Sequence, residues 1–159
     1  MVQIKPATPN DIPAILPLIE HYWRFEGIDG FDAERVGCQL NRLFSNPDLG
    51  AGWIAYVDGV ATGYLLAVQV FSLEYLGLTA EIDEFFVLSS QRGGGVGAAL
   101  LRAAEVEFIQ RGYTNMALQL ARGNDAARAF YHRQGYIDRA GYELLDKHLA
   151  AAPFTSIPG

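Results

Sequence analysis

Apolar residues along the chain recur with two different spacings, which predict a mixture of helices and strands. Helical spacing follows the cap-like residues 8–11, stops near Gly27 and resumes after Asp32. Alternating or continuous apolar runs indicate strands, and Asp58-Gly59 between two of them indicates a hairpin turn. We therefore expect helices over residues 12–23, 33–44, 96–108 and 124–133, and strands over residues 2–5, 53–57, 60–71, 80–88, 116–120 and 136–145.

The order of these elements, β-αα-βββ-α-β-α-β, predicts the fold class. A run of three strands in the middle of the chain favours a mixed, mostly antiparallel central sheet flanked by helices, an α/β (α+β) fold. No repeat and no domain boundary is visible, so we expect a single domain over residues 1–159. Residues 136–145 are expected to form its last strand, or a hairpin that turns at residues 138–141. We expect residues 150–159 to be a flexible tail.

Composition and charge exclude several classes of protein. The net charge of −6 argues against a nucleic acid partner, and no apolar run is long enough to predict a membrane span. The N-terminal residues do not resemble a signal peptide, and Cys38, the only cysteine, excludes an internal disulfide. A cytoplasmic location fits these features. His21, His132 and His148 do not have the spacing of metal ligands, so we expect no metal.

A glycine-rich stretch, SSQRGGGVGAALL at residues 89–101, lies where an apolar strand is followed by a helix. Such a turn offers backbone N–H groups to a phosphate at the positive end of a helix dipole, and Arg92 adds a mobile cation. A P-loop is excluded because Gly97 is followed by alanine. The spacing Gly93-x-Gly95-x-x-Ala98 satisfies the dinucleotide fingerprint, but it lies past mid-chain and the expected acidic residue is missing. The third interpretation is the pyrophosphate loop Arg/Gln-x-x-Gly-x-Gly/Ala of coenzyme A-dependent acyltransferases. A tight turn without a ligand would need only one glycine.

A second motif, ARGNDAARAFYHRQGY at residues 121–136, follows the predicted strand 116–120. On a helix, Asn124, Ala127 and Tyr131 share one face. Each has a purely structural interpretation as well, because Asn124 suits an N-cap and Tyr131 suits a packed aromatic. Their combination after the glycine-rich stretch favours a functional face.

With these two motifs the chain resembles the GNAT superfamily of acyl-CoA N-acyltransferases over nearly all of residues 2–146. The resemblance implies that acetyl-CoA or coenzyme A is the cosubstrate, with the backbone of residues 85–87 pairing with the pantetheine arm and residues 92–98 cradling the pyrophosphate. It places Asn124 on the cofactor arm and Tyr131 by the thioester sulfur. The implied cofactor-binding residues are Phe85, Phe86, Val87, Arg92, Gly93, Gly94, Gly95, Val96, Gly97, Ala98, Asn124, Ala127 and Tyr131. A looser resemblance, in FSLEYLGLTAEIDEFFV and GYELLDKHLA, is to diamine N-acetyltransferases.

Acetyl transfer to an amine requires a base, an acid and a donor to the carbonyl oxygen. An amine with a pKa of about 10.4 is protonated at neutral pH, so a general base must remove a proton before attack. Asp83 and Glu84 are the candidate bases, with solvated surface charge as the alternative. Alternation places Asp83 with Glu81 on one face and Glu84 on the other, unless a bulge intervenes. Tyr131 is the candidate acid for the leaving thiolate, and a backbone amide near Val87 is the candidate donor to the oxyanion.

The sequence therefore predicts an acetyl-CoA-dependent N-acetyltransferase that acts on a primary amine. Two acidic groups favour a small cationic amine as the acceptor, although solvated surface charge is an equal alternative for the second group. The alternatives are a protein N-terminal or lysine acetyltransferase, a catalytically silent coenzyme A-binding sensor or interaction module, and, more distantly, a nicotinamide oxidoreductase. The resemblance also allows a homodimer. The first acidic group is Glu74, Glu81, Asp83 and Glu84, and the second is Glu20, Glu26, Asp29 and Asp32.

Overall fold

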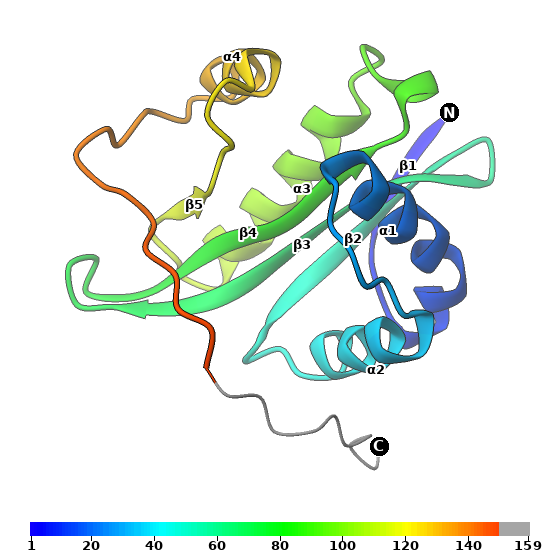
Figure 1. Cartoon of the computed structure of the whole chain (residues 1–159), viewed down its shortest axis with the longest axis horizontal. Coiled ribbons are helices and arrows are strands. Elements are labelled where there is room, and N and C mark those ends of the chain that lie inside the picture. The colour runs from blue at the N-terminus through cyan, green and yellow to red at the C-terminus, as the bar shows by residue number, and fades with distance from the viewer. Residues whose placement is uncertain (150–159) are drawn as a thin grey trace. The chain divides into compact units, whose positions relative to one another are not determined.

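The computed structural model describes residues 1–149 of the chain, which divides into two compact units on either side of the Leu118–Gln119 bond. The predicted tail, residues 150–159, lies outside the described residues. Short 3-10 turns at Pro9–Asp11 and Ser89–Gln91 precede the first and third helices. The first unit contains β1 (Val2–Pro6), α1 (Ile12–Glu26), α2 (Ala33–Phe44), β2 (Gly50–Val57), β3 (Val60–Ser72), β4 (Gly77–Val87), α3 (Val96–Gln110) and β5 (Met116–Leu118), and the second contains α4 (Asp125–Arg133) (Figure 1).

The strands of the first unit form one sheet in the order β1-β2-β3-β4-β5. The first four strands pair antiparallel. β5 pairs parallel with β4, because the chain crosses back through α3 before it re-enters the sheet. α1 and α2 lie on one face of the sheet and α3 lies on the other (Figure 1). The predicted mixed, mostly antiparallel sheet flanked by helices is therefore confirmed.

Alternating side chains of the strands supply the core on both faces of the sheet. On one face, Tyr64 and Leu66 of β3 pack in a cluster with Ile19 of α1. On the other face, Trp53 of β2 meets Phe108 of α3 with ring centroids 5.5 Å apart. All five side chains are buried, and burial of a large apolar side chain stabilises the fold by about 1.5–3 kcal/mol. This packing holds α1 over the sheet face that carries Tyr64.

The last predicted strand, residues 136–145, is absent, and this part of the prediction is wrong. These residues follow α4 as an irregular segment that is tied back to the helix. Asp138 Oδ1 accepts a hydrogen bond from Arg128 Nη1 at 2.8 Å and lies 2.9 Å from His132 Nε2. Apolar alternation produces a strand only where one face is packed against neighbours. Ile137 is 84% exposed, so this apolar side chain does not pack against a buried face.

A buried carboxylate joins β1 to the start of α1. The Asp11 side chain, only 5% exposed, pairs with Lys5 Nζ at 2.7 Å. It also accepts hydrogen bonds from the Thr8 N–H at 2.8 Å, the Thr8 hydroxyl at 3.1 Å and the Tyr56 hydroxyl at 3.3 Å. Burial raises the pKa of Asp11, but the bonds from Lys5 and Thr8 outweigh burial, so the pKa lies below its ordinary value. The fold therefore stabilises the charged form of Asp11.

We expect Asp11→Asn to lower the free energy of unfolding by roughly 1–3 kcal/mol at neutral pH, because hydrogen bonds to a charged group are lost. The folded pKa of Asp11 is below the unfolded one, so its contribution is complete above the unfolded pKa and is lost as pH falls through the folded pKa. The difference between wild type and variant should therefore shrink in acid, which urea unfolding at neutral and acidic pH measures. Asp58→Asn, which breaks an exposed pair with the N-terminal amine, is the matched control and should change nothing measurable. A similar loss in both variants would contradict the special role of Asp11.

Candidate active site

A β-bulge interrupts the pairing of β3 with β4 at Asp83. Leu66 of β3 pairs with Glu84, whereas the next residue, Ala67, pairs with Ile82, so Asp83 is the extra residue on β4. A bulge leaves one residue outside the hydrogen-bonded ladder and redirects the side chains beside it. The bulge therefore decides where the acidic side chains of β4 point.

The bulge brings Glu81 and Glu84 to the same face of the sheet. Glu84 lies opposite Leu66, and Glu81 lies opposite Val68. Residues directly opposite each other share a face, and Leu66 and Val68 are two residues apart, so their partners share a face as well. The alternation that would separate Glu84 from Glu81 therefore does not apply, because the bulge allowed as the exception occurs at Asp83.

Glu84 is held by two donors from different elements. The Tyr64 hydroxyl of β3 donates to Oε1 at 2.8 Å, and Trp23 Nε1 of α1 donates to Oε2 at 2.9 Å. Burial raises the pKa of Glu84 above its ordinary value, and the two hydrogen bonds oppose that shift. Neither donor is predicted by the sequence. Trp23 reads as one more apolar residue in the stripe of α1, and the position of Tyr64 opposite β4 depends on a strand register that the sequence does not show.

Asp83 is exposed, whereas the adjacent Glu84 is partly buried. The surrounding protein still removes part of the water around the carboxylate, and this burial, followed by the charge of Glu81, raises the pKa of Asp83. Tyr22 of α1 is affected by both carboxylates of the bulge. Burial, then Glu26, Glu84 and Asp83, raise the pKa of Tyr22 to about 12. Asp83, Glu84 and the tyrosines around them form one electrostatic cluster, which we call the β4 acidic cluster.

Aromatic side chains border the β4 acidic cluster at Phe86. The His21 ring lies 5.3 Å from the Phe86 ring. The Arg92 guanidinium lies over the rings of Phe25 and Phe86, at 5.2 Å and 5.6 Å from their centroids, and its Nε donates to the Val87 carbonyl at 2.9 Å. The Arg92 side chain therefore has defined partners on both β4 and α1, and its role toward a phosphate stays a prediction.

The glycine-rich stretch forms the turn that leads into α3, as predicted. Gly93 and Gly95 have φ of 81° and 85°, in the left-handed region that favours glycine, and Gly95 is the N-cap of the helix. Apart from the adjacent residues of the chain, no atom lies within 4 Å of the position that a Cβ would take at Gly93 or Gly95. The exposed glycines thus lead into the first turn of α3, whose N–H groups are at the positive end of the helix dipole. This arrangement fits a pyrophosphate group.

The second motif forms α4, which begins after Asn124. Asn124 Oδ1 accepts a hydrogen bond from the Ala127 N–H at 3.2 Å, so this side chain caps the helix. The Tyr131 ring lies edge-on to the rings of Phe130 and Tyr136, with centroids 5.3 Å and 5.7 Å away. The structure thus shows the cap and the aromatic packing that the sequence allows, and the roles of Asn124, Ala127 and Tyr131 toward a cosubstrate stay predictions.

The acidic residues near the break between α1 and α2 have several roles. Glu20 pairs with Arg24 of the same helix at 2.8 Å. Asp32 caps α2 by accepting a hydrogen bond from the Arg35 N–H at 3.0 Å. Glu26, at the end of α1, acts on the β4 acidic cluster through its effect on Tyr22. The proposed second acidic group is therefore partly structural.

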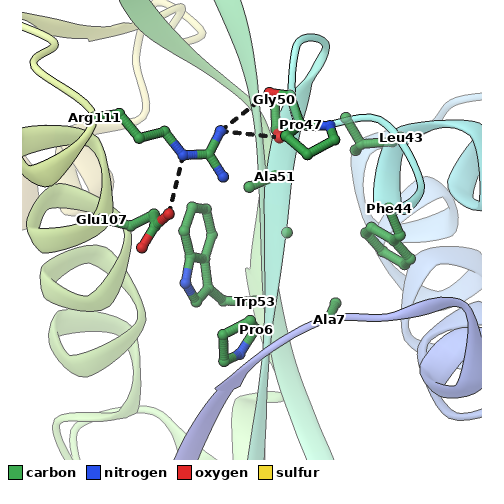
Figure 2. A pocket seen from close by; sticks show the side chains of 11 residues that line it. Pro6, Ala7, Leu43, Phe44, Pro47, Gly50, Ala51, Trp53, Glu107 and Arg111 are labelled. Atoms are coloured by element: carbon green, nitrogen blue, oxygen red, sulfur yellow. Dashed lines mark hydrogen bonds and ion pairs between the residues drawn. The ribbon is translucent and has the colours of Figure 1, made fainter.

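A separate pocket of about 150 Å³ lies at the C-terminal ends of α2 and α3 (Figure 2). Arg111 at its rim donates to the carbonyls of Pro47 at 3.1 Å and Gly50 at 3.4 Å, and to Glu107 at 3.0 Å. Figure 2 shows these contacts above the Trp53 indole. They join α3 to the loop before β2, which is a structural role. The pocket contains none of the residues that the sequence predicts for the site; its lining is Pro6, Ala7, Leu43, Phe44, Pro47, Gly50, Ala51, Gly52, Trp53, Glu107 and Arg111.

The family of this chain follows from comparison with known proteins. Residues 13–136, which include the β4 acidic cluster, the glycine-rich turn and α4, match the model of the acetyltransferase (GNAT) family. The chain belongs to the GNAT family. The predicted acyltransferase class is confirmed at this level.

Three similar proteins show how this GNAT chain relates to others. An uncharacterized N-acetyltransferase of Bacillus subtilis, YhfO, is 27% identical over 141 residues, which are 89% of this chain and 93% of that protein. The aminoalkylphosphonate N-acetyltransferase of Salmonella typhimurium is 32% identical, with 84% of each chain covered. The structure of AAC(6')-Iy in complex with the bisubstrate analogue CoA-S-monomethyl-acetylneamine superposes with a TM-score of 0.80, 19% identity, and 95% and 99% of the two chains covered. Proteins of this fold thus bind coenzyme A derivatives, as predicted for the cosubstrate.

Two further features of residues 1–149 concern membrane-spanning helices and metal-binding groups. In this part of the chain, no helix is long and apolar enough to cross a membrane. The same residues contain no group of three or more histidine, cysteine, aspartate or glutamate side chains that is placed to hold a metal ion.

Proposed function

We propose that this protein transfers an acetyl group from acetyl-CoA to the primary amine of a small cationic acceptor. The observation that carries the proposal is the position of the two carboxylates of the bulge, Asp83 and Glu84. They lie on the strand that runs directly into the glycine-rich turn, so a base and a phosphate-binding helix start belong to one continuous segment, residues 83–98. Family membership supports the reaction class, and the charge of this segment supports the acceptor class.

The carboxylates of the bulge would perform the first step. One of them removes a proton from the acceptor ammonium, and the resulting lone pair on nitrogen forms a bond to the thioester carbonyl carbon. The carbon–sulfur bond then breaks, sulfur leaves with the bonding electrons, the amide nitrogen loses its second proton to water, and the base returns the first proton to solvent. A backbone amide near Val87 would stabilise the charge on the carbonyl oxygen. Tyr131 would donate to the leaving thiolate, a role that rests on the motif around it.

The coenzyme would be held mainly by backbone groups. We propose that Phe85, Phe86 and Val87 pair with the pantetheine arm, and that the turn 92–98 binds the pyrophosphate. Two glycines with positive φ and open space around them support this assignment, because close approach of a phosphate requires bare backbone. The helix-dipole charge at the start of α3 adds to the attraction.

The acceptor identity is tested by a panel of amines with acetyl-CoA, read by release of free thiol. The β4 acidic cluster should favour 1,4-diaminobutane over a neutral amino acid, a lysine peptide and an aminoalkylphosphonate, whose phosphonate carries negative charge. Best activity on an acidic or uncharged acceptor would overturn the cationic assignment. A protein that binds coenzyme A but releases no thiol with any amine would instead be a silent coenzyme-binding module.

We expect salt to weaken the use of a diamine more than the use of a neutral amino acid. Raising ionic strength from about 0.1 M to about 1 M shortens the Debye length from about 10 Å to about 3 Å, which screens partly exposed charges such as Asp83. The KM for 1,4-diaminobutane should therefore rise several-fold, while the KM for alanine changes little. Steady-state kinetics at saturating acetyl-CoA measures both values. Equal changes for the two acceptors would contradict an electrostatic acceptor site.

A further inference from the structure

The two carboxylates of the bulge are adjacent in sequence but have different partners. Each oxygen of Glu84 accepts one hydrogen bond, from Tyr64 and from Trp23. The Asp83 carboxylate makes no hydrogen bond or ion pair with residues 1–149. Glu84 is partly buried, whereas Asp83 is exposed. Two groups with such different surroundings are suited to different tasks.

The two donors of Glu84 favour its ionised form and oppose the effect of burial. An indole N–H can only donate, so Trp23 requires an acceptor oxygen, and Tyr64 directs its hydroxyl hydrogen at the other oxygen. Protonation of Glu84 would weaken both charge-assisted bonds. An ionised carboxylate has about four acceptor positions, so each oxygen still has one for another donor.

The negative charge of Glu84 is not compensated within the described part of the chain. Its two donors are neutral groups, and no lysine or arginine of residues 1–149 forms an ion pair with it. A partly buried charge is costly unless an opposite charge lies near it. The chemistry of the site therefore calls for a cation from outside the chain, and a substrate ammonium has the right charge and donors.

Asp83 has the properties of the group that exchanges protons. No hydrogen bond within residues 1–149 has to break when it accepts a proton, and its exposure lets it pass that proton to water. A general base works best when its pKa is near the pH of the reaction, and burial and Glu81 raise the pKa of Asp83 in that direction.

We propose that the two carboxylates divide the work: Asp83 takes the proton from the reacting amine, while Glu84 stays ionised and binds a second positive charge of the acceptor. Trp23 and Tyr64 are then positioning residues that act through Glu84. The acceptor class is an aliphatic amine with a second ammonium group. This inference rests on the acetyl transfer proposed above.

The pH dependence that follows involves the titratable groups of α1, β3 and β4 that lie near Glu84 or its neighbours. These groups are His21, Tyr22 and Glu26 on α1, Tyr64 on β3, and Glu81 and Asp83 on β4. Burial raises the pKa of Glu84, and the hydrogen bonds from Tyr64 and Trp23 oppose that rise. Removing either donor therefore raises that pKa, so Glu84 should lose its charge at a higher pH in Trp23→Phe or Tyr64→Phe than in the wild type.

The test compares 1,4-diaminobutane with butylamine, which has the same chain length and lacks the second amine. We expect the wild type to favour the diamine by about tenfold or more in kcat/KM. This is the gain expected from one hydrogen bond between the second ammonium group and the charged Glu84. Glu84→Gln should remove this preference, because the amide has no charge with which to bind the second ammonium group. Asp83→Asn should lower kcat by about 100-fold for both amines. Trp23→Phe should lose the preference at a higher pH than the wild type does, because Glu84 then loses its charge at a higher pH.

The outcomes separate this inference from the proposed function. If the wild type releases no thiol from acetyl-CoA with either amine, the acetyl transfer itself is contradicted. An active wild type that uses both amines equally well would overturn the role of Glu84. So would a Glu84→Gln variant that loses turnover on both amines while Asp83→Asn keeps it. Tyr64→Phe, which removes one oxygen from a fully buried ring, provides the same pH test if Trp23→Phe does not fold.

Discussion

Tyr131→Phe should lower the turnover number by roughly 100-fold with little change in the affinity for acetyl-CoA. The substitution removes one hydroxyl and keeps the ring that packs against Phe130 and Tyr136. A thiol has a pKa of about 8.5 and a tyrosine about 10, so complete proton transfer to the thiolate is unfavourable by about 2 kcal/mol. A charge-assisted hydrogen bond from Tyr131 would offset much of that cost, and it would exist only while the thiolate forms. The loss should therefore appear in kcat.

Tyr136→Phe is the matched control for this experiment. It makes the same chemical change on the ring that faces Tyr131, 5.7 Å away, so it reproduces any general effect of losing a phenol hydroxyl in this unit. Stopped-flow thiol release measures turnover, and calorimetry measures coenzyme affinity. Wild-type turnover in Tyr131→Phe would leave Tyr131 only the packing role that the structure shows.

Local signals in the sequence were sufficient for most of the fold. Asp32 was expected to start a helix, and its carboxylate caps α2. Asp58 and Gly59 were expected to form a hairpin turn, and both have positive φ, of 50° and 82°, as the twist of a two-residue hairpin requires. These features depend on a few neighbouring residues, which the sequence shows directly. The strand at 136–145 failed because its formation depends on packing that alternation alone does not reveal.

The candidate site was less predictable than the fold, because its geometry depends on contacts between distant segments. The bulge at Asp83 is a property of the β3–β4 register, in which Leu66 and Ala67 pair across one extra residue. The bonds from Trp23 and Tyr64 to Glu84 span 61 and 20 residues of sequence. Sequence spacing identified the carboxylates and the glycine-rich turn, but it did not distinguish a fixed carboxylate from a free one.

The strongest test of the coenzyme site uses Gly97, the second residue of α3. Gly97→Asp should weaken acetyl-CoA binding by about 100-fold or more, because two like charges about 4 Å apart near a protein surface repel by about 4 kcal/mol. The same substitution should not destabilise the helix. An acidic side chain in the first turn interacts favourably with the helix dipole, and glycine is a poor helix former. A loss of affinity with unchanged or higher thermal stability would therefore report on the phosphate.

Gly97→Asn separates charge from bulk, because asparagine has nearly the shape of aspartate without its charge. We expect it to bind acetyl-CoA much more tightly than Gly97→Asp, and the difference between the two variants should shrink as salt screens the repulsion. These differences are measured by calorimetric titration with acetyl-CoA, and with fragments of the coenzyme that either keep or lack the pyrophosphate. Only ligands that carry the pyrophosphate should discriminate between the variants. If both variants bind acetyl-CoA as the wild type does, the turn before α3 does not hold the pyrophosphate, and the coenzyme assignment of residues 92–98 is wrong.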